Sequence, residues 1–250
     1  MKNYPCALLG FIVAASSAFA ATVPYSDNFQ AGTVTEWTSG GGAPATWGIV
    51  NTGTSNVYQV TSSASAGNFT SVVQLTNATS ALQSFTMTSS FKITDGSAGE
   101  FIGFAAFSNN ITPGFGSNYV ADIASGGQMR IIAQNDTSGF SSTAATFATS
   151  LVVGTNYTMS LTSTYVGGTL NMTFTLTNGT QSQSVTATDT SPLTGTYFGY
   201  RLNNSTDSLV TQFSNFTVTT SPIPEPASAA MLLGLGALGA VGTVRRRRVR

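Results

Sequence analysis

The segment NYTMSLTSTYVGGTLNMTFTLTNGTQSQSVTAT, residues 156 to 188, alternates apolar and polar side chains through its successive runs. Successive side chains of a strand point to opposite faces, so alternation with period two predicts strands that bury one face. Gly167-Gly168 and Asn178-Gly179 are dipeptides typical of two-residue hairpin turns of the primed types. The segment therefore predicts a three-stranded antiparallel meander. The apolar face of its first run consists of Tyr157, Met159, Leu161 and Tyr165.

The same pattern recurs through residues 21 to 220, which are rich in threonine, serine, asparagine and glycine and contain no apolar periodicity of helical length. A dozen or so short strands in about 200 residues predict an all-β domain, a single two-sheet antiparallel β-sandwich of the jelly-roll type. A domain of this size can build an adequate core without disulfides. The further predicted strands are 46–50, 57–61, 69–75, 82–94, 100–108, 118–124, 128–134, 196–203 and 213–220.

The charge of this segment excludes some classes of function. Between residues 22 and 220 only Lys92, Arg130 and Arg201 are basic, against eight carboxylates, so the segment carries a net charge of about −5. Such a surface repels phosphate backbones, and we expect no binding of nucleic acid. Histidine is absent from the chain, which excludes His-ligated metals and Ser-His-Asp hydrolysis.

The N-terminus, MKNYPCALLGFIVAASSAFA, has one lysine, a short apolar core and a small-x-small site at Ala18 and Ala20. This pattern predicts a secretory signal peptide over residues 1 to 20, with a buried N-terminal helix as the alternative. The apolar run is too short to span a bilayer. Cleavage would remove Cys6, the only cysteine, and leave an exported protein without thiols or disulfides.

Residues 221 to 250 combine three features in order: a Pro-Glu-Pro triplet, an uncharged apolar run from 227 to 244, and a basic tail. As a helix the apolar run would cover roughly 27 Å, enough to span a bilayer. The tail would stay cytoplasmic by the positive-inside rule. A plain single-pass anchor explains the run and the tail but not the triplet. The residues of the triplet and tail are Pro224, Glu225, Pro226, Arg245, Arg246, Arg247 and Arg248.

This arrangement resembles the PEP-CTERM family of bacterial sorting signals. The resemblance implies recognition of Pro224, Glu225 and Pro226 by a membrane-embedded exosortase, and a host that makes exopolysaccharide. The protein would then be an exosortase substrate that sits in the inner membrane before processing and reaches the cell envelope or the extracellular matrix afterwards.

A second resemblance concerns the two ends of the exported domain. YSDNFQAGTVTEW (25–37) and QFSNFTVTT (212–220) are similar to the opening and closing strands of concanavalin A-like jelly rolls, including laminin-G-like domains. The resemblance implies that the first and last strands pair and bring Asp27 and Asn215 to the same region. The alternatives are an unrelated β-sandwich or a short parallel β-helix, although no fixed-period repeat supports the latter.

Several residues are candidates for chemistry in the exported domain. Hydrolysis of a glycan needs two carboxylates that face one cleft, and no paired motif is present, although Glu36 and Glu100 remain a conceivable pair. We therefore expect no enzyme activity. Laminin-G-like folds often bind calcium, and the terminal-strand resemblance singles out Asp27 for it, with a turn cap as the alternative. No other cofactor is expected.

Glycan binding would use exposed aromatic faces and side-chain amides. Trp37 and Trp47 flank the predicted loop TSGGGAPAT and are the main candidates, with Tyr58 and Tyr119 as further ones. Aromatic residues in strands are more often core residues, which is the alternative interpretation. The sequence thus predicts an exported surface or matrix protein that is structural or glycan-binding. Its expected partners are an exosortase and exopolysaccharide. A glycan hydrolase with an unrecognised carboxylate pair is the competing hypothesis.

Overall fold

The structure, a computed structural model of the chain, describes residues 23–41, 45–62, 67–75, 84–96, 100–110, 116–135, 137–147, 149–204 and 208–220. The predicted signal peptide and the predicted sorting signal lie outside these residues. Within the described part of the chain, no helix is long and apolar enough to cross a membrane.

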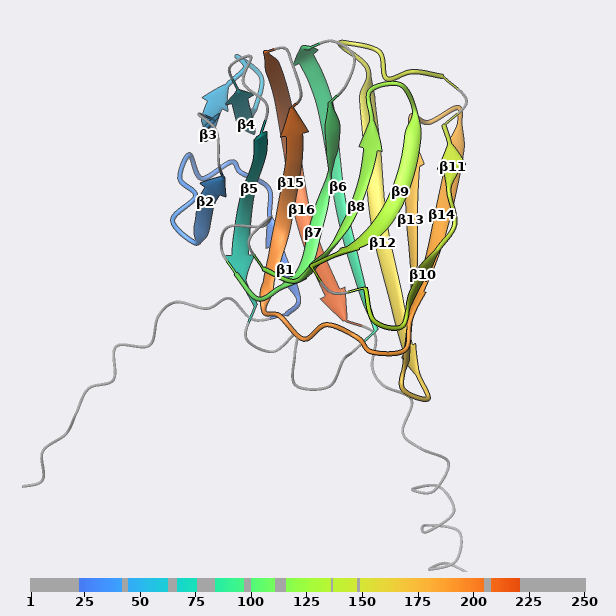
Figure 1. Cartoon of the computed structure of the whole chain (residues 1–250). Coiled ribbons are helices and arrows are strands. Elements are labelled where there is room, and N and C mark those ends of the chain that lie inside the picture. The colour runs from blue at the N-terminus through green and yellow to red at the C-terminus, as the bar shows by residue number, and fades with distance from the viewer. Residues whose placement is uncertain are drawn as a thin grey trace, which may run out of the picture.

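The described residues form two antiparallel β-sheets that pack face to face (Figure 1). The larger sheet has nine strands in the order β10-β14-β13-β12-β6-β16-β4-β3, and β1 pairs with β16 beside this path. The smaller sheet has seven strands in the order β11-β9-β8-β7-β15-β5-β2. The prediction of an all-β, two-sheet antiparallel sandwich is confirmed.

The strand bounds follow the predicted segments closely over most of the chain. The strands of the nine-stranded sheet are β1 (Tyr25–Asp27), β3 (Ala45–Asn51), β4 (Asn56–Ser62), β6 (Phe85–Asp95), β10 (Phe140–Ser142), β12 (Asn156–Val166), β13 (Thr169–Thr177), β14 (Ser182–Asp189) and β16 (Leu209–Thr220). The strands of the seven-stranded sheet are β2 (Trp37–Gly41), β5 (Gly67–Gln74), β7 (Phe101–Ser108), β8 (Asn118–Ala124), β9 (Gln128–Gln134), β11 (Ala145–Thr146) and β15 (Tyr197–Asn204).

The predicted meander is present as β12, β13 and β14, with one change at its second turn. Gly167 and Gly168 both have positive φ, 60° and 87°, as a type I′ turn requires. At the second turn the ladder ends at Thr177 opposite Ser182, and the N–H of Asn178 donates to the carbonyl of Gln181 at 3.2 Å. Its side-chain oxygen also accepts the N–H of Gln181 at 2.8 Å, which caps the turn. The turn residues are therefore Gly179-Thr180, and the predicted dipeptide Asn178-Gly179 was wrong by one position.

The first and last strands pair, as the resemblance to concanavalin A-like folds implied. β1 runs antiparallel to β16, and Asp27 lies opposite Phe216, the neighbour of Asn215. One edge of β16 is divided between two partners, because β4 pairs with residues 209–213 and β1 with residues 216–218. The two ends of the described domain thus lie side by side at one end of the sandwich.

Three strands have no counterpart among the predicted segments. β10 and β11 are only three and two residues long, too short to show a period. β2, with the sequence WTSGG, contains two glycines and was predicted as the start of a loop between the two tryptophans. Gly41 fits there because a Cβ would stand 2.5 Å from the carbonyl oxygen of Asn68 on the neighbouring strand. The close approach of two backbones explains this glycine, whereas from the sequence alone the glycines of this segment indicate a turn.

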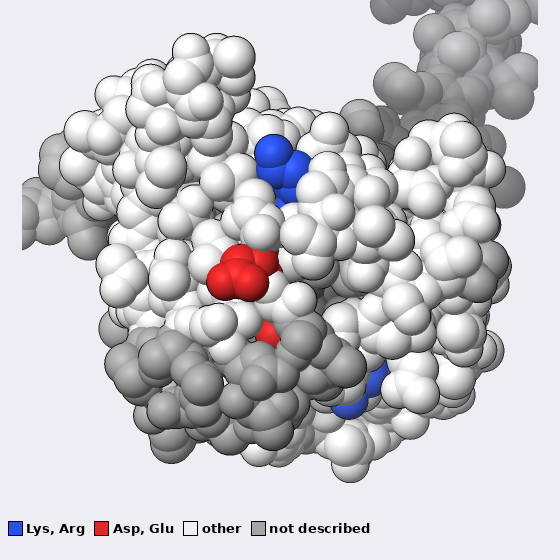
Figure 2. All heavy atoms as spheres, turned by 90° about the horizontal axis from the view of Figure 1, so that it is seen from above, with Lys and Arg blue, Asp and Glu red and all other residues white. Residues whose placement is uncertain are grey.

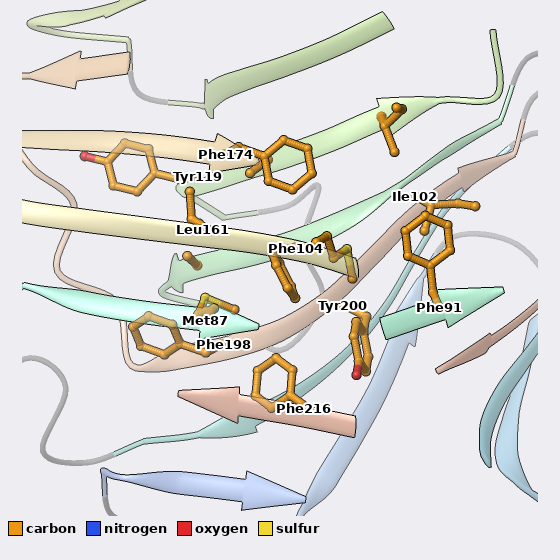
Figure 3. Close-up of a cluster of buried hydrophobic side chains, with 14 of the residues drawn as sticks. Met87, Phe91, Ile102, Phe104, Tyr119, Leu161, Phe174, Phe198, Tyr200 and Phe216 are labelled. Carbon is orange, nitrogen blue, oxygen red and sulfur yellow. The ribbon is translucent and has the colours of Figure 1, made fainter. Parts of the chain in front are cut away.

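The core lies between the sheets and is dominated by aromatic rings (Figure 3). Tyr200 on β15 is central, since its ring lies 3.9 Å from that of Phe213 and 5.4 Å from that of Trp37. Such ring pairs contribute about 0.5–1.5 kcal/mol each beyond the burial of their area. The Tyr200 hydroxyl donates to the carbonyl of Asn215 at 2.9 Å, which satisfies its polar end. This cluster fixes the seven-stranded sheet firmly on β16.

Candidate functional site

The outer face of the seven-stranded sheet differs from an ordinary solvent-facing sheet surface. β8 is buried at all seven positions, and β7 at all but its first. Residues on both faces of these central strands are therefore shielded from water. A buried outer face that contains ionised side chains needs those side chains to be paired.

Three ionised residues form a row across this face, and we call Asp122, Arg130 and Arg201 the charged row. Arg130 donates from Nε to Asp122 Oδ1 at 2.7 Å and from Nη2 to Asp122 Oδ2 at 3.2 Å. Arg201 donates from Nη1 to Asp122 Oδ2. One carboxylate thus holds two guanidinium groups, both by charge-assisted hydrogen bonds.

The strand register places these residues together. Asp122 and Arg130 are direct partners across the β8–β9 hairpin. Gly103 on β7 lies between Asp122 and Arg201, because it pairs with both. A Cβ at Gly103 would stand 2.1 Å from the carbonyl oxygen of Ala121 and 2.6 Å from the Cβ of Asp122. The missing side chain leaves the space in which Arg201 reaches Asp122 across an intervening strand.

The row is buried at its centre and open at one side. The side chain of Asp122 is 0% exposed and that of Arg201 6%, whereas that of Arg130 is 37% exposed. Burial lowers the pKa of Arg201, and the negative charge of Asp122 opposes this shift. The three formal charges sum to +1, in a domain whose other charges are mainly acidic. The row therefore presents a positive guanidinium to solvent.

Polar and aromatic side chains lie along the charged row, and we call Phe101, Arg130, Asn68 and Asn203 the Arg130 patch. Phe101 contacts Arg130, whereas the two asparagines lie on β15 and β5 and are linked to Arg130 through Arg201 and Asp122. The Arg130 guanidinium lies over the Phe101 ring, 3.9 Å from its centroid, in a cation–π contact. The side-chain oxygen of Asn68 accepts from Arg201 Nη2 at 2.6 Å and from the Asn203 amide at 2.8 Å. All four residues of the patch are partly exposed.

The predicted glycan-binding aromatics lie mostly inside the core. Trp37 is 8% exposed, and its indole stacks on Tyr200 at an interplanar angle of 10°. Tyr58 and Tyr119 are 1% and 0% exposed. The core interpretation describes these three residues.

Trp47 lies on β3, the last strand of the nine-stranded sheet's path, and is partly exposed. Its ring lies 5.3 Å from that of Tyr58, so it borders the same aromatic cluster. Its indole N–H is buried and has no hydrogen-bond partner among the described residues. Both tryptophans thus pack on the core cluster through Tyr58, and neither presents two open ring faces.

Asp27, the predicted calcium ligand, already uses both carboxylate oxygens. Oδ1 accepts the N–H of Phe29 at 2.7 Å, and Oδ2 accepts the indole N–H of Trp37 at 2.9 Å. The residue caps the turn after β1 and orients Trp37, as the turn-cap alternative describes. Within the described ranges, no three acidic, cysteine or histidine residues gather as a metal-binding group. Calcium binding at Asp27 stays a prediction.

The conceivable catalytic pair, Glu36 and Glu100, is split between the two ends of the sandwich. Glu36 precedes Trp37, which pairs with Val73 near the end of β5. Glu100 precedes Phe101, which lies opposite Asn203 on β15. Asn203 in turn lies opposite Asn68, the second residue of β5, so Glu100 is near the start of β5. The two levels differ by five residues, about 17 Å along a strand. Glu100 is 1% exposed and borders a cavity of about 200 Å³, which also contacts Gly96 and Leu151.

Charged side chains are sparse on the surface of the sandwich at the end that is uppermost in Figure 1. Figure 2, seen from above the view of Figure 1, shows a few isolated charged spots on an otherwise uncharged surface. Sequence reasoning did not single out the charged row, although a signal for it exists. Alternation in NYVADIA places Asp122 on the face opposite Tyr119 and Ala121, and a hairpin between 124 and 128 brings residue 122 opposite 130. The link to Arg201 required the order of the strands.

One family of known proteins matches the C-terminal part of the chain. Residues 222–248 match the family described as the PEP-CTERM protein-sorting motif. The sequence has no match among curated proteins.

Solved structures resemble the chain at low sequence identity. Lectin II from Ulex europaeus is 12% identical with a TM-score of 0.51, and the match covers 80% of this chain and 98% of the lectin. Lectin UEA-II complexed with galactose, 11% identical, has the same TM-score and coverage. A protein of unknown function from Shewanella oneidensis MR-1 is 14% identical, with a TM-score of 0.50 over 84% of this chain and 92% of that protein.

The described domain therefore has the fold of concanavalin A-like jelly rolls. The sorting motif adds the second part of the description, because it implies an exported protein that an exosortase processes and that is anchored in the membrane beforehand.

Proposed function

We propose that this chain is an exported glycan-binding protein of the cell surface or extracellular matrix. Its C-terminal signal delivers it to an exosortase, and its β-sandwich binds polysaccharide without cleaving it. The observation that carries the binding proposal is the Arg130 patch, in which the Arg130 guanidinium lies over a partly exposed ring and two amides lie at the Arg201 end of the same charged row. The lectin-like fold supports the proposal but does not identify a ligand.

The sorting step depends on the three features of the C-terminal motif. Pro224 and Pro226 restrict the backbone to extended conformations and prevent a helix from continuing outward. Glu225 offers the one acidic charge between the domain and the apolar run. An anchor alone needs only apolar length and a basic stop, so the triplet separates processing from anchoring.

Replacing Glu225 by alanine in the native host tests the sorting step. Membrane insertion should be unaffected, whereas processing should fail and full-length protein should accumulate in the inner membrane. Mass and fractionation of wild type, Glu225→Ala and the neighbouring control Ser221→Ala measure this. If wild type and Glu225→Ala both keep Arg245 to Arg248 and stay in the inner membrane, the chain is a plain anchored protein.

Glycan binding at the Arg130 patch follows from the chemistry of sugars. A sugar ring presents C–H groups to an aromatic face and hydroxyls to planar amides, and binding sites combine an apolar surface with a few well-placed polar groups. Asn68 uses its side-chain oxygen for internal bonds, so the geometry leaves its NH₂ group for a ligand. The described carboxylates are scattered or paired internally, which favours binding over hydrolysis.

A glycan array with the purified domain of residues 21 to 220 tests the binding proposal. This range is suitable because the end strands β1 and β16 pair within the sandwich and the core lies wholly inside it. We expect the wild-type domain to bind at least one polysaccharide on an array, and Phe101→Ala to weaken that binding. Val166→Ser is the matched control, since Val166 is an exposed apolar residue on the β12–β13 hairpin. A parallel assay for released reducing ends should stay at background. Reducing-end release would favour the hydrolase hypothesis, and no binding to any glycan would overturn the proposal.

A further inference from the structure

Arg130 keeps part of its hydrogen-bonding capacity for solvent. Its Nε and Nη2 atoms bind Asp122, whereas Nη1 donates to no acceptor in the described part of the chain. A guanidinium has five N–H groups in a rigid fork that suits carboxylates, so the unused edge of Arg130 is a ready donor pair.

The carboxylate behind Arg130 does not repel an approaching anion strongly. Asp122 is fully buried and both its oxygens are occupied by guanidinium groups. The second of these, Arg201, adds a positive charge directly below the patch. A ligand at the surface therefore meets a site of net charge +1 in which the negative group is shielded.

No other place in the described domain offers this combination. The basic residues there are Lys92, Arg130 and Arg201, and Lys92 lies on β6 of the other sheet. Lys92 is also partly exposed, and its cross-strand partners Asn156 and Gln212 are amides, but no aromatic ring lies over its ammonium group among the described contacts. The Arg130 patch is thus where an anionic group and a sugar face can be held together.

We propose that the Arg130 patch recognises acidic polysaccharide, with Arg130 Nη1 and Nη2 donating to the carboxylate of a uronic-acid residue. The exposed part of Phe101 contacts the C–H face of that sugar, and the Asn68 and Asn203 amides at the Arg201 end of the row bind hydroxyls of a neighbouring sugar in the same polymer. This inference rests on the proposed glycan binding and names the class of glycan. Binding is non-covalent, and its expected strength depends on ionic strength because the main contact is a charge pair.

A pair of polymers that differ only in their carboxylates provides the sharpest test. Polygalacturonate carries free carboxylates, and highly methyl-esterified pectin has largely the same backbone with the charges masked. We expect the wild-type domain to bind polygalacturonate roughly tenfold more tightly or better, which corresponds to one charge-assisted hydrogen-bonding contact. Calorimetry at two salt concentrations should show weaker binding at higher salt.

Two variants with the same change of charge locate the contact. Arg130→Gln should lower the affinity for polygalacturonate by about tenfold or more, while Lys92→Gln should leave it within about twofold. Arg130→Lys keeps the charge but loses the planar fork, so it should bind with an intermediate affinity. Circular dichroism and urea unfolding of each variant verify the fold, because Arg130→Gln also removes one partner of Asp122.

Each outcome decides between the two proposals. Equal binding of both polymers, or of a neutral polymer alone, would overturn the acidic class but leave glycan binding in place. An equal loss in Lys92→Gln and Arg130→Gln would show a diffuse charge effect and overturn the site. Absence of binding to every polysaccharide would overturn the proposed function itself. If Arg130→Gln does not fold, the polymer pair and the salt dependence of the wild type still decide the question.

Discussion

The outer faces of the two sheets are built on different rules. On the nine-stranded sheet the central strands β6, β12 and β13 alternate regularly between buried and more exposed residues. Its outer face is covered by hydroxyl side chains that pair across strands, such as Thr175 with Ser184 at 2.7 Å and Ser90 with Thr158 at 3.1 Å. This surface is uncharged apart from its margins and faces water.

The seven-stranded sheet has a buried outer face instead, and charges hold it together. Its central strands show no alternation in burial, because Val120, Asp122 and Ala105 are shielded like the residues that face the core. The comparison teaches that regular alternation marks the water-facing surface, where a single side chain contributes little to stability. The irregular strands are those in which a buried carboxylate and two arginines set the geometry of a site.

The largest expected effect concerns the centre of the charged row. Asp122→Ala leaves the buried Arg201 guanidinium without its carboxylate, so the free energy of unfolding should fall by about 3–5 kcal/mol. Urea denaturation of the purified domain measures this loss.

A second substitution separates the pair from its burial. In Asp122→Ala combined with Arg201→Met, the unpaired buried charge is gone, and we expect a large part of the lost stability to return. A double variant as unstable as Asp122→Ala alone would show that the row is not held by the charge pair.

Two glycines provide the next contrast between the sheets. Gly103→Ala on β7 drives a methyl group against the Ala121 carbonyl, 2.1 Å away, and should cost about 1–3 kcal/mol through overpacking. Gly48→Ala on β3 of the nine-stranded sheet finds nothing within 4 Å and should change stability by less than about 0.5 kcal/mol. Thermal unfolding of the two variants side by side tests the contrast. Similar melting temperatures would mean that β7 and β8 can separate without penalty.

These contrasts also show what the sequence could predict. The meander 156–188 and the strands 118–124 and 128–134 follow from alternation or from short apolar runs between turns, and the end strands pair as their motifs implied. β10 and β11 are too short to carry a period, and β2 hides its pairing behind glycines that the neighbouring backbone requires. The local sequence pattern does not predict such strands, because tertiary contacts determine whether they form.

The site was harder to predict than the fold, for a physical reason. Trp37 and Trp47 were reasonable candidates, since sugars stack on aromatic rings, but burial on Tyr58 and Tyr200 uses their faces for packing. The charged row depends on the order of β8, β7 and β15 in the sheet. Arg201 is 79 residues from Asp122 in sequence, and no local spacing predicts their contact.

The stability of the core between the two sheets should decrease at alkaline pH. Burial raises the pKa of Tyr200 and of Tyr58, which lie on inner faces of opposite sheets. Raised folded-state pKa values mean that stability is complete below pH 10.0, the ordinary value, and falls as the unfolded chain ionises above it. Tyr200, whose pKa is raised well above the ordinary value, should then cost about 1.4 kcal/mol per pH unit above that point.

Unfolding measured from pH 8 to 11.5 tests this slope. Tyr200→Phe should make the decline shallower by roughly one tyrosine, about 1.4 kcal/mol per pH unit, although it also loses the bond to Asn215 at every pH. An unchanged slope in this variant would place the alkaline loss elsewhere. Tyr58→Phe provides the corresponding measurement from the nine-stranded sheet.

The smallest expected effect lies on the hydroxyl-covered face. Thr175 and Ser184 are direct partners across β13 and β14, and their hydroxyls bond at 2.7 Å in contact with water. Because water replaces a lost exposed hydrogen bond, Thr175→Ala should cost less than about 1 kcal/mol, and a double-mutant cycle with Ser184→Ala should give a coupling of about 0.2–1 kcal/mol. The same cycle between Asp122 and Arg201 should give a coupling several times larger, since no water reaches that pair to compensate for a lost partner. Urea unfolding of all six variants in one buffer provides both values. Equal couplings would contradict the distinction between the two faces, because they would mean that the buried row is as well solvated as the threonine surface.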